Sequence, residues 1–205
     1  MFRASASGSW MFSALNSIKE DTINGKTVHT SSPHYNVTKG VRTMVSKKMH
    51  VALNKQIGYE FSSAYLYLSM SAHFHAVNLP GFAHWMNEQY KEEMGHGMKF
   101  FSYIYERGGK VELEAIDKPP SSFKNPLDIF KQVLDHEKKV SGTINALYEL
   151  ALKESDYPSQ VMLHWFIAEQ VEEEKAASDI IEQLKMIGDA PAGLMMLDRQ
   201  LAARS

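Results

Sequence analysis

The chain has 205 residues, of which 44% are hydrophobic and 22% charged, and its formal net charge at pH 7 is -2. This size and balance are typical of one globular domain and give no reason to expect nucleic acid or a membrane as partner. The absence of cysteine excludes disulfides and thiolate metal sites, so any bound metal must take oxygen and imidazole ligands. No apolar run approaches the roughly 20 residues that span a bilayer.

The first 43 residues differ in composition from the rest. They are rich in Ser, Thr, Gly and Asn, show no sustained helical or strand period, and lack the compact apolar stretch of a secretory signal. The interpretation we favour is that translation begins at Met44 and that residues 1–43 come from a misassigned start or from cloning. A disordered native extension and an organellar targeting peptide are the alternatives. We therefore predict one folded domain over residues 44–205.

The rest of the chain follows a helical pattern. Apolar residues recur at 3.6-residue spacing over about 46–77, and after the break at Pro80 a second helix extends to about residue 106. Asn125 and Pro126 suit the N-cap and first turn of a third helix. No strand pattern competes, so the predicted fold class is all-α.

The third helix extends to about residue 154 and a fourth follows the break at 155–158, ending near Lys185. A short amphipathic fifth helix is predicted over about 191–203. The linker over 107–124 is different from the short breaks, because its 18 residues can cross the roughly 40 Å length of the long helices. Short breaks join antiparallel neighbours, whereas this linker makes the second and third helices parallel. The predicted architecture is a four-helix bundle with one long crossover.

Metal-ligand residue types occur in matching register on the first two helices. Glu60 lies on the first helix, and Glu93 and His96 form a Glu-x-x-His pair on the second. The midpoint of 60 and 96 is 78, at the turn, so these residues lie at one height in an antiparallel hairpin. Glu93 and His96, three apart, share a helix face. A single Glu-x-x-His pair is a weak signal, and the argument depends on the register across helices.

The second hairpin repeats this construction 77 positions later with Glu137, Gln170 and Glu173. A Glu on each of two helices and a Glu-x-x-His on each of the other two is the di-iron carboxylate pattern. Here Gln170 and Glu173 replace the second Glu-x-x-His pair. We predict one iron held by the first-hairpin residues and a second, looser iron held by Glu93 as a bridge, Glu137 and Gln170. Ligand sets rich in oxygen suit iron that cycles between ferrous and ferric states.

A further acidic group lies beside this set on the second and fourth helices. Its members are Glu92, Glu169, Glu172 and Glu173. No matching row of Lys or Arg neutralises them in the sequence, and four carboxylates facing one place repel one another unless a cation lies among them. We interpret them as a third iron site on the route out of the centre.

Three runs in these helices, 58–67, 92–96 and 169–174, resemble those of prokaryotic non-haem ferritins. The similarity covers about residues 44–205. It implies a ferritin-like bundle that stores iron, oxidises Fe(II) as a ferroxidase with dioxygen or peroxide, and assembles in the cytoplasm as a homo-24-mer. In that shell the short fifth helix would line fourfold channels.

The resemblance also implies residue roles. The ferroxidase ligands would be Glu60, Glu93, His96, Glu137 and Gln170. The third-site ligands would be Glu92, Glu169, Glu172 and Glu173. Tyr67 matches the tyrosine beside the centre, as a buried hydroxyl or electron donor near the irons, and ordinary aromatic core is the alternative. For Trp165, one turn before Glu169, core packing is the favoured interpretation over a redox role.

Three other functions compete with storage. A di-iron oxidase or peroxidase with a fixed cofactor would require a second histidine, and rubrerythrins also require a cysteine-ligated iron. A haem-binding bacterioferritin-like protein would use Met94, but it would also carry a second Glu-x-x-His pair, so we do not expect haem. A metal-free helical interaction protein gives no physical reason for buried carboxylates in matched register.

Overall fold

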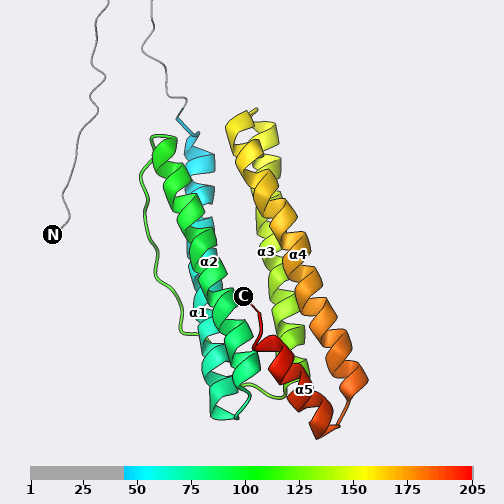
Figure 1. Cartoon of the computed structure of the whole chain (residues 1–205). Coiled ribbons are helices and arrows are strands. Elements are labelled where there is room, and N and C mark those ends of the chain that lie inside the picture. The colour runs from blue at the N-terminus through cyan, green and yellow to red at the C-terminus, as the bar shows by residue number, and fades with distance from the viewer. Residues whose placement is uncertain (1–43, 205) are drawn as a thin grey trace, which may run out of the picture. The chain divides into compact units, whose positions relative to one another are not determined.

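The computed structural model describes residues 44–204, and the expectations for residues 1–43 lie outside this range. Five α-helices and no strand occur in the described part (Figure 1). Their bounds are α1 Lys47–Ala76, α2 Pro80–Glu106, α3 Pro126–Lys153, α4 Tyr157–Ile187 and α5 Pro191–Leu201. The predicted helices are confirmed to within a few residues. None of the described helices combines the length and apolar content that a membrane span requires.

Side-chain caps explain where three of the helices begin. The side chains of Ser46, Asn125 and Asp156 accept hydrogen bonds from backbone amides in the first turns of α1, α3 and α4. Each cap satisfies an amide that has no partner within its own helix. The predicted N-cap at Asn125 is therefore confirmed.

The start of α2 is capped by a residue from the other end of the chain. Leu79, at the N-cap position, makes no side-chain hydrogen bond. Instead, Asp198 of α5 accepts hydrogen bonds through Oδ1 from the amides of Gly81 at 2.8 Å and Phe82 at 3.0 Å. A Cβ at Gly81 would lie 1.6 Å from the backbone oxygen of Asp198, so this close approach requires glycine.

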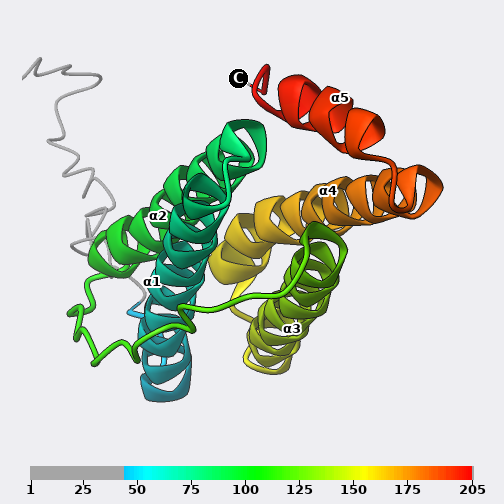
Figure 2. The ribbon, with the colours of Figure 1, turned by 90° about the horizontal axis from the view of Figure 1, so that it is seen from below.

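The helices form two antiparallel hairpins joined by a long crossover. Helix α1 packs on α2 and α3 packs on α4, while α1 and α3 are in contact between the hairpins (Figure 2). The linker between α2 and α3 runs the length of the first hairpin, so α2 and α3 are parallel, as predicted (Figure 1). Along its course the amide of Glu112 donates to Asn54 Oδ1 at 2.7 Å, and Ser69 Oγ donates to the Pro120 carbonyl at 2.5 Å.

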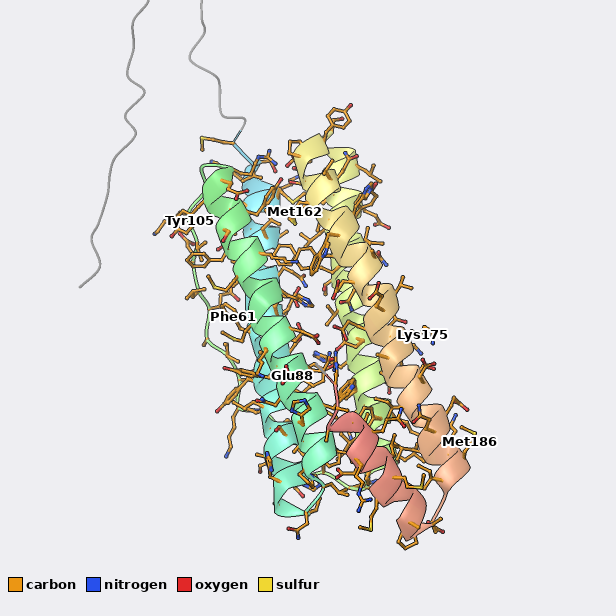
Figure 3. The ribbon with its side chains drawn as sticks, viewed as in Figure 1. Phe61, Glu88, Tyr105, Met162, Lys175 and Met186 are labelled. Atoms are coloured by element: carbon orange, nitrogen blue, oxygen red, sulfur yellow. The ribbon has the colours of Figure 1, made fainter. Side chains whose placement is uncertain are left out.

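The apolar core is divided into two clusters. One includes Phe74, Phe82 and Phe130 and lies toward the α1–α2 turn, where α5 also packs. The other includes Leu53 and Phe100 and lies toward the opposite end, where side chains such as Met162 pack against it (Figure 3). On each long helix buried polar residues lie between the two clusters, so the middle of the bundle is a polar layer. Three other buried polar residues, Asn54, Ser71 and Ser159, lie outside this layer.

Candidate metal centre

Buried polar side chains from all four long helices make up this middle layer. They are Gln56, Glu60, Ser63, Gln89, Glu93, His96, Glu137, Gln170 and Glu173. Four of them are carboxylates, and none of the four is more than 6% exposed. Burying several like charges together is costly unless a cation or protons compensate them.

Glu60, Glu93 and His96 meet within this layer as the register predicts. One ligand atom from each lies within 4.8 Å of the others, and His96 Nδ1 is 3.3 Å from Glu93 Oε2. Glu60 Oε1 accepts a hydrogen bond from Gln56 Nε2 at 3.0 Å. By contrast, Oε2 of Glu60 and Oε2 of Glu93 are buried without a hydrogen-bond partner. Two unpartnered oxygens beside an imidazole form a donor set that fits a metal ion.

The electrostatics of the two carboxyls agree with this geometry. Burial, reinforced by repulsion from Glu93, raises the pKa of Glu60 well above its ordinary value. Burial and the nearby Glu137 likewise raise the pKa of Glu93. Without a cation the pair therefore favours protonation, and a bound metal ion would supply the missing positive charge.

Glu137, on α3, is held by two donors. Tyr67 donates its hydroxyl hydrogen to Glu137 Oε1, and Gln170 Nε2 donates to Glu137 Oε2 at 3.1 Å. Tyr67 is fully buried, and both burial and the Glu137 carboxylate raise the pKa of its hydroxyl, so it stays a neutral donor. Glu137 is close enough to raise the pKa of Glu93 electrostatically. The structure thus places Tyr67 in direct contact with the second half of the predicted centre.

A second group lies on the α4 side of His96. His96, Glu169 and Glu173 offer ligand atoms within 4.8 Å of one another. Glu173 accepts a hydrogen bond from Gln89 Nε2 at 2.7 Å, and burial together with Glu137 raises its pKa to about 7. Within the described residues, Glu92 belongs to neither ligand group.

The sequence predicted that no row of Lys or Arg neutralises Glu92, Glu169, Glu172 and Glu173, and for Glu92 this prediction is wrong. Arg204 Nη2 lies 2.8 Å from Glu92 Oε2. Glu172 is exposed and, among the described residues, belongs to neither ligand group. The predicted third set is therefore divided. Glu169 and Glu173 lie against His96, whereas Glu92 pairs with Arg204 and Glu172 is exposed. We call Glu92 and Glu172 the outer acidic residues.

Trp165 differs from its core interpretation as well. It is 38% exposed, its ring meets the His96 ring edge-on at 5.4 Å, and Lys99 Nζ lies 2.8 Å from its ring centroid. Trp165 therefore covers one side of the His96 ring, and Lys99 in turn covers Trp165. Trp165 thus lies at the boundary between the polar layer and the surface.

Several residues of the layer were not singled out from the sequence. Gln56 and Gln89 each lie four positions before a predicted ligand, Glu60 and Glu93, so helix geometry places them on the same face. That spacing is the signal that could have found them. Arg204 gives no comparable signal, because it is 112 positions from Glu92.

A buried layer of carboxylates with one imidazole, inside two hairpins joined by a long crossover, defines a carboxylate metal-binding four-helix bundle. The model of the ferritin-like domain family matches residues 51–187. The chain belongs to this family, and the family prediction from the sequence is confirmed.

Known relatives match over most of the chain. A bacterial non-heme ferritin of Bacteroides fragilis is 43% identical over 161 residues, covering 78% of this chain and all of that protein. A bacterial non-heme ferritin of Staphylococcus haemolyticus is 39% identical over 162 residues, covering 79% of this chain and 98% of that protein. Among solved structures, an open pore ferritin from the archaeon Archaeoglobus fulgidus has a TM-score of 0.78 and 46% identity, covering 78% of this chain and 98% of that one.

Proposed function

We propose that this protein stores iron and oxidises Fe(II) at the middle of the bundle, as a ferroxidase that uses dioxygen or peroxide. Membership of the ferritin-like family and the relatives named above support iron storage with this activity. The observation that carries the proposal is the pair of buried, unpartnered oxygens on Glu60 and Glu93 beside His96. Fe(II) is the substrate of this site, and the ferric product is the cargo.

Two iron ions would occupy the layer during oxidation. Glu60, Glu93 and His96 would bind the first, and Glu93 would also face the second, held by Glu137 and Gln170. Each Fe(II) loses one electron, and the two electrons with two protons reduce dioxygen to hydrogen peroxide. Each half offers two carboxylates, but the third ligand of this half is an amide, and its nitrogen already donates to Glu137. A neutral amide oxygen is a weaker metal ligand than the imidazole of His96. Weaker binding there suits a substrate that must leave after oxidation.

The ferric product would leave through the four residues of the third set. Glu169 and Glu173 would take the ion beyond His96, and Glu92 and Glu172 would complete a third site on the way to the interior of a shell. We infer a homo-oligomer of twenty-four chains in the cytoplasm, with α5 at its fourfold channels.

Aerobic loading of the purified full chain with Fe(II) tests this function. Size-exclusion chromatography with iron quantified in the protein peak should show a large particle that carries far more iron per chain than its side chains can ligate. A small particle with about two irons per chain would favour a fixed di-iron oxidase or peroxidase, the alternative for this ligand set. A haem band in the visible spectrum would instead favour a bacterioferritin-like protein.

A further inference from the structure

Helix α5 and the residues after it return along α2 and are held there at two points. Asp198 of α5 caps the start of α2, and the His84 ring Nε2 donates to the backbone carbonyl of Arg204 at 2.8 Å. Figure 1 shows the C-terminal end of the described chain lying back toward the middle of the bundle rather than leaving it. The tail therefore reaches the height of the polar layer.

Three side chains of α2 fix the Arg204 guanidinium in place. Nη2 lies 2.8 Å from Glu92 Oε2, Nη1 donates to Gln89 Oε1, and the guanidinium carbon lies 4.8 Å from the centroid of the Trp85 ring. The Arg204 side chain is 25% exposed. A planar, delocalised cation suits this combination of a carboxylate, an amide oxygen and an aromatic face better than an ammonium group would.

Gln89 links Arg204 to the second ligand group. While its Oε1 accepts from Arg204, its Nε2 donates to Glu173 Oε2 at 2.7 Å. Arg204 thus touches Glu92 directly and orients Glu173 through one amide. Its charge also opposes the rise in the pKa of Glu173 that burial and Glu137 cause.

We propose that Arg204 is a built-in cation that competes with iron for Glu92 and so keeps iron binding at the outer site weak. This inference rests on the proposed function, because it concerns how product leaves the centre. A metal ion that binds Glu92 must displace the guanidinium or share the carboxylate with it, and two cations side by side repel each other. Arg204 is a positioning residue here: it lowers the occupancy of the exit site and favours onward transfer of iron.

Anaerobic titration of the assembled full chain with Fe(II) by isothermal titration calorimetry tests the proposal. In R204Q the outer site should bind Fe(II) roughly three- to tenfold more tightly, while affinity at Glu60, Glu93 and His96 is unchanged. R204K keeps the charge but loses the planar fork, so its affinity should lie between. R199Q is the matched control, because it removes the same charge from an exposed position on α5, and it should bind like the wild type.

A second substitution separates electrostatic competition from loosening of the tail. If Arg204 acts through Glu92, adding E92Q to R204Q should abolish most of the gain in affinity. Equal outer-site affinity in R204Q and wild type, or weaker affinity in R204Q, would overturn the proposal. If the wild type binds no Fe(II) at Glu60, Glu93 and His96, the proposed function fails instead. The two failures are distinguishable, because this one concerns the inner ligands and the other concerns Glu92. Should R204Q not assemble, an R204K affinity equal to that of the wild type would overturn the proposal.

Discussion

The inner and outer acidic groups of this bundle contain the same type of side chain but differ in what surrounds them. Glu60 and Glu93 are buried, and one oxygen of each has no hydrogen-bond partner. Glu92 is partly exposed and pairs with an arginine, and Glu172 is exposed. Burial without a protein counter-charge favours binding of a metal ion, whereas exposure and a neighbouring arginine favour brief occupancy.

The largest effect is expected on removing Glu93, the carboxylate proposed to be shared by the two inner irons. E93A should lower the initial rate of Fe(II) oxidation by about 100-fold or more, because both ions lose a ligand. Stopped-flow absorbance after mixing anaerobic Fe(II)-loaded protein with dioxygen measures it. E88A is the matched control, since Glu88, which is labelled in Figure 3, lies on the same helix but pairs with Lys91. An unchanged rate in E93A would remove the inner group from the mechanism.

A second substitution tests whether burial of the inner carboxylates is costly in the metal-free protein. Because the folded pKa of Glu60 is raised, its contribution to stability is fully present below the ordinary carboxyl pKa and is lost as the pH rises through the raised value. In EDTA at pH 7.5, E60Q should therefore be about 1–3 kcal/mol more stable than wild type, with a smaller difference near pH 4. Urea unfolding followed by circular dichroism measures this.

Metal should reverse the order of these two proteins. Zn(II) should stabilise the wild type more than E60Q, because the wild-type group offers one more charged oxygen. If E60Q is the less stable protein in EDTA at pH 7.5, the buried carboxylate is stabilising without metal, and the contrast with the outer group is lost.

The contact of Tyr67 with Glu137 on α3 predicts a smaller effect. Y67F removes the hydroxyl that donates to Glu137 and leaves Gln170 as the remaining described donor to that side chain. We expect roughly a three- to tenfold slower oxidation with unchanged Fe(II) stoichiometry, since one hydrogen bond to a charged group is lost. Kinetics and equilibrium titration on the same preparation check both parts. A loss of one bound iron per chain would show that the hydroxyl is needed to keep the ligand in place.

The smallest effect is expected at the exposed edge of the outer group. E172Q should leave the initial rate of the first oxidation within about twofold of wild type, because Glu172 belongs to neither ligand group among the described residues. It should change the rate of later turnovers, when product must leave. Repeated additions of Fe(II) with the same absorbance readout separate the two phases. Identical behaviour over all additions would remove Glu172 from the exit route.

Much of this fold and its inner group follows from simple geometry. Proline and glycine mark the ends of the helices, and residues equidistant from a hairpin turn share a height, so the positions of Glu60 and His96 in the sequence are enough to pair them. The same reasoning predicted that Glu137 and Gln170 lie together, and a hydrogen bond joins their side chains. Helix periodicity is a local property and is read directly from the chain.

The surroundings of the outer group could not be predicted in this way. The pairing of Arg204 with Glu92 depends on the direction in which three residues leave α5, and no periodicity describes them. The partial exposure of Trp165 depends on how it packs against His96 and Lys99 of the distant helix α2. Contacts between distant segments without a repeating pattern leave no local signal in the sequence.

The cap that Asp198 provides for α2 has a consequence for how the chain is made. Asp198 follows Gly81 by 117 positions, so both hairpins and the crossover emerge from the ribosome before it does. Until then the amides of Gly81 and Phe82 lack this acceptor, and the first turn of α2 is free to fray. Helix α5 therefore completes the N-terminal cap of α2. A product that stops before α5 lacks this cap on the helix that bears Glu93 and His96.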